Sequence, residues 1–259
     1  MKTPVKTNTS FISSKALKEI FDKQQDIVSF LLFSGQIECD LAFDDYNITV
    51  FTNRWANYEF WDCLIKDPYR IANLADGIHK QMDPHMVMLL QDSWVRMKDP
   101  FLRSALYFVL NRYSADGTVS HGSFNSNNYS SICSRSLINF YESNELDKFK
   151  IKYYKAEKYY DAFEHVKDSQ VMLLPVGNIK ISPLNKQVFV GHEMYDLDYG
   201  ILKTVLRECG KKFVAVFKFN PKIIRDFSKY NISMIDNVGD FTIDAKSCNE
   251  IIVHNLELS

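Results

Sequence analysis

Two kinds of apolar spacing alternate along the chain. Residues 27–33, 171–176 and 212–219 are continuous apolar runs, which are typical of strands buried on both faces of a sheet. Between such runs, apolar residues three or four positions apart predict amphipathic helices. Further strands are predicted at 46–52, 151–155, 231–236 and 249–258, and helices at 15–23, 57–66, 160–166 and 223–230.

Turn and cap residues set the limits of these elements. The helix at 57–66 is expected to end before Asp67-Pro68, because a residue that precedes proline avoids the helical conformation. The periodicity from 70 to 113 is helical, with Asp99 as N-cap of one helix. Asp196 is expected to cap a later helix that Gly210 ends.

The order of these elements predicts the fold class. Alternating strands and helices indicate an α/β protein with a mainly parallel, twisted, Rossmann-like sheet and helices on both faces. Residues 114–131 form a polar stretch rich in Ser, Asn and Gly, which predicts a long loop of functional or mobile character. We therefore expect residues 1–66 and 148–259 to form one α/β domain, with 67–147 inserted as a helical and loop-rich subdomain.

Composition narrows the function classes. Hydrophobic residues make up 46% of the 259 residues and charged residues 24%, so the chain is expected to be globular. The net charge of −1 does not indicate a strongly basic nucleic-acid binder, although local basic patches stay open. The five cysteines are widely spaced without a C-x-x-C pair, which indicates reduced thiols in a cytoplasmic protein and neither a metal site nor a disulfide framework. No signal-peptide h-region and no membrane-length apolar run occur.

Several segments, taken in order, resemble the Dam-type DNA adenine methyltransferases, which transfer a methyl group from S-adenosylmethionine to adenine. FISSK is similar to the family's N-terminal Y-x-G-G/S-K, and FLLFSGQIECDLAF to its F-x-D-L-F-S-G-x-G cofactor motif. VMLLPVG falls where the family has V-Y-x-D-P-P-Y, and NEIIVHN is similar to a closing E-x-L-I-x-N strand. The resemblance covers nearly the whole chain and implies the methyltransferase fold with an inserted DNA-recognition subdomain. VFTNRWANYEFW resembles the family's segment with an Asn-Asp pair after the second strand, and the stretch 107–125 is described below. In chain order, the six segments are residues 11–15, 30–43, 50–61, 107–125, 171–177 and 249–255.

The catalytic motif is where the chain departs most from that family. In D-P-P-Y, the acid and a proline carbonyl accept hydrogen bonds from the adenine amine, and the aromatic residue stacks on the flipped base. Here the acid is replaced by Leu174, the first proline is kept as Pro175, and the remaining positions are Val176 and Gly177. Leucine accepts no hydrogen bond, and an unpaired buried amine costs about 1–3 kcal/mol. The resemblance therefore implies no catalytic residue in this chain.

The implied cofactor site is also altered. Four of its residues match the family motifs, whereas the acid expected to face the cofactor's methionine part is Leu31 and the second glycine of the motif is Ile37. A ligand ammonium without its carboxylate is costly to bury, and a β-branched side chain fills the space that glycine leaves. Asn53 stands for the acid that holds the ribose hydroxyls, a change that still permits hydrogen bonds. The matching residues are Lys15, Phe33, Ser34 and Gly35.

Two segments are candidates for contact with nucleic acid. The stretch 107–125 resembles the family's L-N-R/K-x-x-[FY]-x-G segment, which implies DNA contacts by Asn111, Arg112, Ser114, His121 and Asn125. Residues 148–160 interleave lysines with tyrosines, a combination that binds phosphates and stacks on bases. The alternative for 148–160, which the pattern favours, is a strand with a solvated lysine face and tyrosines packed inward.

These departures predict a pseudo-methyltransferase that keeps the fold, has lost catalysis, and acts by binding a protein partner or DNA. No cofactor is expected, or S-adenosylmethionine if the ancestral pocket survives. Near-neutral charge favours a protein partner, because neutralising phosphates needs a basic surface. The alternatives are an active S-adenosylmethionine-dependent adenine methyltransferase with an atypical site, and a DNA-binding module that masks methylation sites. A homodimer or a heterodimer with an active methyltransferase stays open, and by analogy we expect a phage or viral source and the host cytoplasm.

Overall fold

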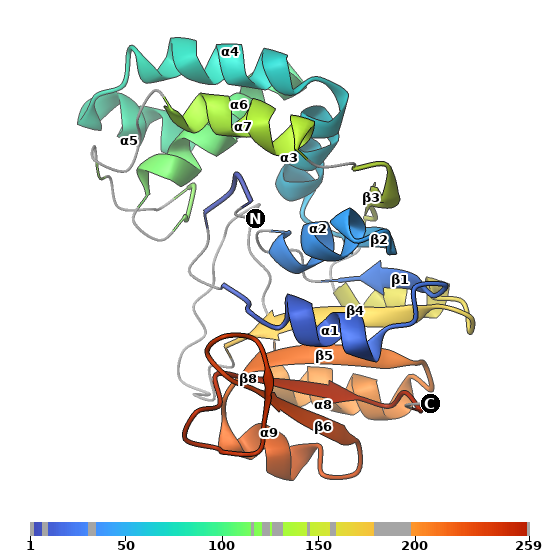
Figure 1. The fold of residues 1–259 in the computed structure, drawn as a ribbon. Coiled ribbons are helices and arrows are strands. Elements are labelled where there is room, and N and C mark those ends of the chain that lie inside the picture. Colours follow the sequence, from blue (N-terminus) through green and yellow to red (C-terminus); the bar gives the residue numbers. More distant parts are fainter. Residues whose placement is uncertain are drawn as a thin grey trace. The chain divides into compact units, whose positions relative to one another are not determined.

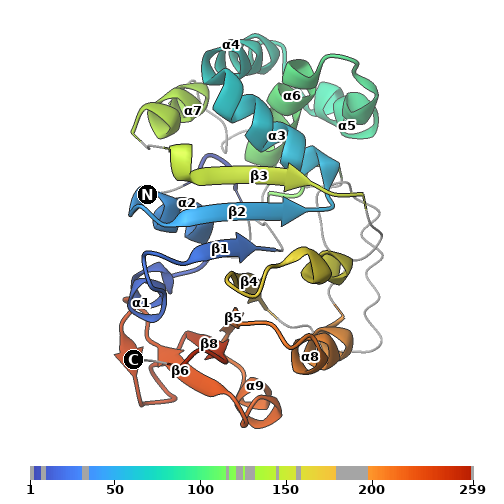
Figure 2. The ribbon, with the colours of Figure 1, turned by 90° about the vertical axis from the view of Figure 1, so that its right-hand side faces the viewer.

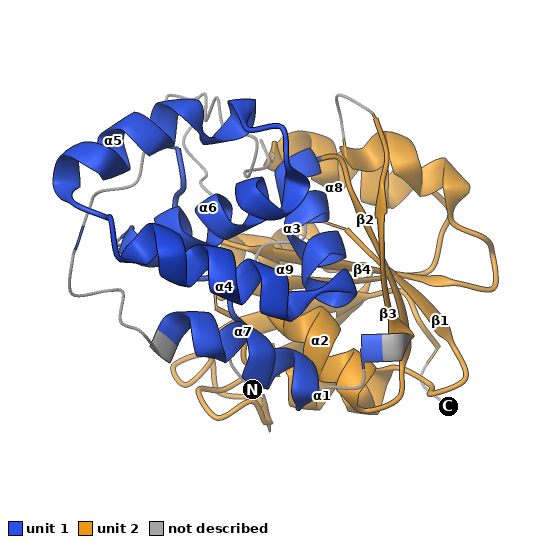
Figure 3. Cartoon of the chain, turned by 90° about the horizontal axis from the view of Figure 1, so that it is seen from above, with its two compact units in different colours: residues 1–8, 54–146, 190–194 blue, residues 9–53, 147–189, 195–259 orange. Residues whose placement is uncertain are grey.

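The computed structural model divides the chain into two compact units, one helical and one α/β (Figure 3). The helical unit takes its described residues from 1–8 and 54–146, and the α/β unit from 9–53, 147–189 and 195–259. The main segment of the helical unit begins at Arg54, whereas the sequence places that boundary after Lys66. The described residues within 1–8 also belong to the helical unit, whereas the sequence places them in the α/β domain. The described residues are 3–6, 10–30, 35–114, 117–120, 125, 132–143, 146–155, 159–178 and 198–257.

The α/β unit is built on one mixed sheet with the strand order β3-β2-β1-β4-β5-β8-β6-β7 (Figures 1 and 2). The first five strands are parallel neighbours, and β8 runs antiparallel between β5 and β6. This confirms the α/β class with a mostly parallel sheet. The strands are β1 (Asp26–Ser29), β2 (Asn47–Thr52), β3 (Phe149–Tyr153), β4 (Val171–Gly177), β5 (Phe213–Lys218), β6 (Asn231–Ile235), β7 (Phe241–Thr242) and β8 (Glu250–His254).

Helices cover both faces of the sheet, as the apolar strands predict (Figure 2). Helices α1 (Ser14–Ile20) and α2 (Gln36–Phe43) lie on one face, and η4 (Tyr159–His165), α8 (Tyr199–Glu208) and α9 (Pro221–Asp226) on the other. The second face buries one core cluster that includes Val28, Phe163, Leu202 and Phe217.

Some predicted elements differ from the observed ones. Strand β1 ends at Ser29 and so occupies only the first part of the apolar run. The predicted helix at 160–166 is a 3-10 helix, and α9 ends at Asp226. Helix α8 is capped by Asp198, whose side chain accepts the Ile201 amide, because that position matches the start of the buried helix face. Asp196 lies outside the described residues.

Proline and aspartate start three helices of the helical unit. The side chains of Asp67, Asp83 and Asp99 each accept a backbone amide of the first helical turn. Pro68, Pro84 and Pro100 follow them, where the missing amide proton costs nothing. The helices are α3 (Trp55–Lys66), α4 (Pro68–His79), α5 (Pro84–Ser93), η1 (Trp94–Arg96), α6 (Pro100–Tyr113) and α7 (Ile132–Glu142), and η3 (Leu146–Lys148) follows them.

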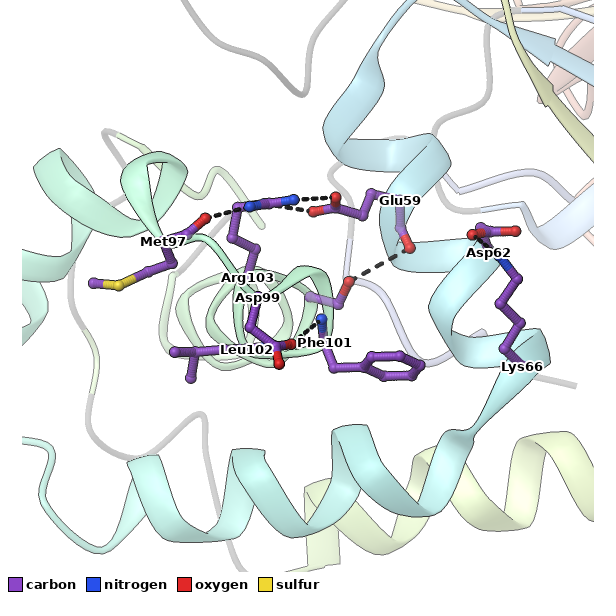
Figure 4. A network of polar contacts seen from close by, with 9 residues as sticks. Glu59, Asp62, Lys66, Met97, Asp99, Phe101, Leu102 and Arg103 are labelled. Carbon is purple, nitrogen blue, oxygen red and sulfur yellow. Dashed lines mark hydrogen bonds and ion pairs between the residues drawn. The ribbon is translucent and has the colours of Figure 1, made fainter.

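Helix α6 is the central element of this unit, and a charged side chain ties it to α3. The guanidinium of Arg103 donates to the carboxylate of Glu59 and to the carbonyl of Met97 (Figure 4). Phe60 on α3 stacks against Phe108 with ring centroids 6.4 Å apart. These contacts place α3 with the helical unit. Helix α7 was not predicted, although it buries Leu137 and Phe140 three positions apart.

Candidate functional site

The carboxyl ends of β1 and β4 form the point where ligands are expected to bind in this topology. β1 and β4 are parallel neighbours, and the chain continues from them toward opposite edges of the sheet. In open α/β sheets, ligands bind outside the strand ends at this switch in strand order. The segments that resemble cofactor and adenine motifs follow or end these strands. The candidate site is therefore the end of β1, β2 and β4.

The residues at the end of β4 are all buried. Leu174 pairs with Ala215 of β5, and its side chain belongs to the core cluster on the η4 and α8 face. Val176 lies in the same cluster, next along that face. Both side chains are at most 2% exposed. The position that the resemblance aligns with the family's catalytic acid is part of the hydrophobic core.

Gly177 has a backbone conformation that the family's aromatic residue would not adopt cheaply. Its φ of 72° is in the left-handed region, and the β4–β5 register shifts between Pro175 and Gly177. A side chain with a Cβ costs about 1–2 kcal/mol in that region. The bulge thus explains why glycine stands at this position.

Aromatic rings occupy the space beside this strand end. Phe30, which follows β1, lies 4.8 Å from the ring of Phe163 and 5.9 Å from that of Phe51, measured between centroids. Tyr159 packs against Phe163 and is 5% exposed. Burial raises the pKa of Tyr159 well above its usual value. The cluster offers packing area and no group that would act as an acid or base near neutral pH.

The first turn of α2 carries a buried acid that the sequence reasoning missed. Gly35 caps this helix with φ 75°, the left-handed conformation that glycine adopts without strain. Ile37 is fully buried, and Glu38 is 2% exposed with its carboxylate 2.8 Å from the hydroxyl of Ser29, which donates to it. Burial raises the pKa of Glu38 to about 7. Glu38 lies one helical turn before buried Leu41 and Ala42, and this spacing was the available signal.

The other predicted cofactor residues that the structure describes, Lys15 and Asn53, lie at separate elements. Lys15 is exposed and forms an ion pair with Asp240, and their hydrogen bond raises the pKa of the lysine. Asn53 directly follows β2 and is half-buried. Leu31, Phe33 and Ser34 lie outside the described residues.

One contact joins two segments that resemble family motifs. Glu250, at the start of β8, is fully buried, and its carboxylate accepts the amides of Ile12 and Ser13 at 3.0 Å each. Lys218 of β5 donates to the same carboxylate at 2.7 Å. The acid of NEIIVHN therefore anchors the FISSK segment to the last strand, and the ion pair with Lys218 compensates its burial.

At two described positions, the residues differ from those that the resemblance implies for S-adenosylmethionine. A β-branched side chain, Ile37, fills the position that glycine leaves open in the motif, and the nearby carboxylate of Glu38 points inward to Ser29. Lys15 is paired with Asp240. Among the described residues we also find no group of three or more His, Cys, Asp or Glu placed to hold a metal ion.

The predicted nucleic-acid residues lie in the helical unit, where the described ones make internal contacts. Asn111 is 1% exposed; its Oδ1 accepts the Lys6 amide, and its Nδ2 donates to the carbonyls of Lys6 and Gly117. Ser114 is also buried, and its carbonyl accepts Lys6 Nζ. These contacts tie the N-terminal segment to the end of α6.

The other members of that set behave differently. Arg112 is half-buried, with its guanidinium 5.5 Å from the ring centre of Phe108. Asn125 is exposed, and its amide donates to the Tyr113 carbonyl. His121 lies outside the described residues. Only Arg112 and Asn125 of the described set have side chains that reach solvent.

The lysine- and tyrosine-rich stretch forms strand β3 and the first turn of η4. Lys150 and Lys152 are exposed, whereas Tyr154 packs against the core cluster and Tyr159 is buried. This matches the favoured interpretation of a strand with a solvated lysine face. Tyr153 differs from it, with 41% exposure.

No protein-family model matches this sequence, and no curated protein is significantly similar to it. Within the described part of the chain, the helices are too short or too polar to cross a membrane. None of the five cysteines, all of which are described, forms a disulfide.

Proposed function

We propose that this chain is a catalytically inactive homologue of the Dam-type adenine methyltransferases that acts by binding a protein partner. The observation that carries the proposal is the end of β4, where a fully buried Leu174 and a left-handed Gly177 stand in the place of the family's acid and aromatic residue. The methyltransferase fold and the role of the helical unit as a former recognition subdomain are parts of the same proposal.

The sheet supports the ancestry. Its first five strands have the order 3-2-1-4-5 of doubly wound folds that bind nucleotides at the switch point. Four segments that resemble family motifs fall at the start of α1, after β1, in β4 and in β8. The carboxylate of Glu250 links the first of these segments to the last, although they are more than 230 residues apart.

Chemistry at the site supports the loss of activity. An adenine amine needs acceptors at the strand end, and a side chain at position 174 is instead buried in the core cluster that also contains Phe30 and Leu202. A charged side chain at this position would be desolvated without a partner. Restoring the acid by Leu174→Asp is therefore expected to unfold the core rather than to restore catalysis.

A protein partner is favoured over DNA by the charge and by the contacts of the helical unit. The chain has 31 Lys and Arg residues and 32 Asp and Glu residues, so it has no excess of positive charge to neutralise phosphates. Asn111 and Ser114 are buried and hydrogen-bonded inside the protein. A protein partner can bind such a near-neutral chain through shape complementarity and apolar contacts, which do not need a basic surface.

Titration with S-adenosylmethionine tests the proposal. A ligand that binds with a dissociation constant of about 10 µM adds about 2.7 kcal/mol of stability at about 1 mM, which a thermal melt detects easily. We expect no shift in melting temperature at that concentration and no heat in calorimetry, with an active adenine methyltransferase as the positive control. Saturable micromolar binding, or transfer of labelled methyl groups to DNA, overturns the proposal in favour of an active enzyme with an atypical site.

A further inference from the structure

Helices α8 and α9 carry a local excess of positive charge. Residues 203–229 run from the middle of α8 to the turn before β6, and they contain eight Lys and Arg residues but only two acids, Glu208 and Asp226. The whole chain has 31 Lys and Arg residues and 32 Asp and Glu residues, so the rest of the chain is acidic. The near-neutral net charge therefore conceals one strongly basic segment.

The two helices bring their cations together around the carboxylate of Asp226. α8 and α9 lie side by side on one face of the sheet (Figures 1 and 2). On α8, Lys203 Nζ lies 3.3 Å from Asp226 Oδ1, and the Arg207 guanidinium donates to the Asp226 carbonyl at 2.9 Å. On α9, Lys222 Nζ lies 5.3 Å from the ring centre of Tyr199, whose hydroxyl donates to the same carboxylate. The carboxylate of Asp226 thus compensates only part of the positive charge around it.

The sheet brings two further lysines to the same end of the α/β unit. Val214 of β5 and Asn231 of β6 both pair with His254 of β8, so β5 and β6 begin at the same end of the sheet. Lys212 and Lys229 each lie two residues before these positions, and both are exposed. We define the basic patch as Lys203, Arg207, Lys212, Lys222, Arg225 and Lys229.

Half of the basic patch is free to pair with a partner's acids. Lys212, Arg225 and Lys229 are exposed, and none of them forms an ion pair with a described residue. The other two lysines of the segment, Lys211 and Lys218, are each paired with a carboxylate and lie outside the patch. Exposed cations without an internal partner raise the local potential, which attracts and orients a group of opposite charge.

We propose that the basic patch binds an acidic segment of a protein partner, whose Asp and Glu side chains pair with its cations. Complementary charge gives such a contact its specificity and its fast association. A short acidic segment contacts the patch alone, whereas a long nucleic acid also meets the acidic remainder of the chain and is repelled by it. The inference rests on the proposed function, because it names the chemistry of the protein partner.

Fluorescence anisotropy of a labelled decaglutamate peptide with the full chain tests the proposal, at about 20 mM salt, where exposed charges are weakly screened. We expect saturable binding that weakens as the salt concentration rises. The double substitution Arg225→Glu with Lys229→Glu is expected to raise the dissociation constant at least about tenfold, because two attractions become two repulsions.

Arg96→Glu with Lys98→Glu is the matched control. Arg96 and Lys98 are also exposed, and their substitution changes the net charge by the same amount, but they belong to the helical unit and lie outside the patch. This variant should bind the peptide within about twofold of the parent, since distant exposed charges contribute little. Melting temperature checks that both double variants fold.

Three outcomes overturn the proposal. The first is no saturable binding at low salt, and the second is an equal loss of affinity in both double variants. The third is tighter binding of a single-stranded DNA of about ten nucleotides that the patch variant loses, because the patch would then recognise phosphates. The proposed function fails separately, through the S-adenosylmethionine titration, which does not involve the patch.

Discussion

At the scale of single residues, the candidate site contains one acid in an unusual setting. Glu38 lies beneath the first turn of α2 and receives a hydrogen bond from Ser29 at the end of β1. Burial raises its pKa from 4.5 to about 7, so the folded protein holds a proton there that the unfolded chain releases near pH 4.5. Stability that depends on this proton is fully present below pH 4.5 and is lost as the pH rises through 7.

Glu38→Gln removes this titration and keeps the side chain's size and its acceptor oxygen. At pH 4 the variant should be about as stable as the parent, because Glu38 is then protonated in both the folded and the unfolded state. At pH 8 it should be more stable, by an amount of the order of 3 kcal/mol if the full pKa difference acts. Urea denaturation at both pH values measures this. An equal stability difference at the two pH values would show that Glu38 does not titrate in this range.

At the scale of elements, the end of α6 depends on a close backbone approach. Gly117 has φ 84°, and a Cβ on it would lie 2.2 Å from the carbonyl oxygen of Lys6. The side-chain Nδ2 of Asn111 donates to the carbonyl of Lys6 and to the carbonyl of Gly117, so it bridges the two segments that meet here. The match to L-N-R-x-x-x-x-G in this segment is thus accounted for by packing inside the helical unit.

Two glycine-to-alanine substitutions should have opposite effects. Gly117→Ala is expected to destabilise the protein by about 2 kcal/mol or more, because left-handed backbone strain adds to the clash with Lys6. Gly77→Ala, in α4, meets no atom within 4 Å and should stabilise by about 0.5–1 kcal/mol. Equilibrium unfolding in urea distinguishes the two. If Gly117→Ala were neutral, the segment at Lys6 would have to move at little cost.

At the scale of the whole molecule, the helical unit is the crossover between two parallel strands. Its residues from 54 to 146 connect the end of β2 to β3, which lies beside β2 in parallel. Such a connection needs only about a dozen residues, so most of the helical unit exceeds what the sheet requires. In the function proposed above, this additional part of the unit recognises a partner, and the net charge of −1 over the whole chain provides no excess of basic residues for phosphates.

Duplex DNA should therefore bind weakly. We expect a dissociation constant above about 10⁻⁵ M at physiological salt, and binding at low salt that weakens steeply as salt rises. Fluorescence anisotropy of a labelled duplex across salt concentrations measures both. Nanomolar binding that resists salt would instead support the alternative of a module that masks methylation sites.

Local patterns predicted most of the elements but not all of their details. The end of a helix before Asp67-Pro68, the aspartate cap at 99 and the strands β2, β4 and β5 follow directly from residue type and spacing. Helix α7 and the two-residue β7 were not predicted, because their patterns are short or interrupted by polar residues. The four-residue length of β1 also escaped prediction, since an apolar run does not reveal where hydrogen bonding to a neighbour stops.

The sequence alone determined the α/β class, the apolar strand at 171–177 and the absence of an acid, a second proline and an aromatic residue at its end. These depend on residue identity and on periods of two and 3.6 residues, which are local properties. Tertiary structure decided the strand order, the inward position of Glu38, the contact of Glu250 with Ile12 and the gathering of cations from α8 and α9 around Asp226. Each of these depends on which distant segments become neighbours, and no local spacing specifies that.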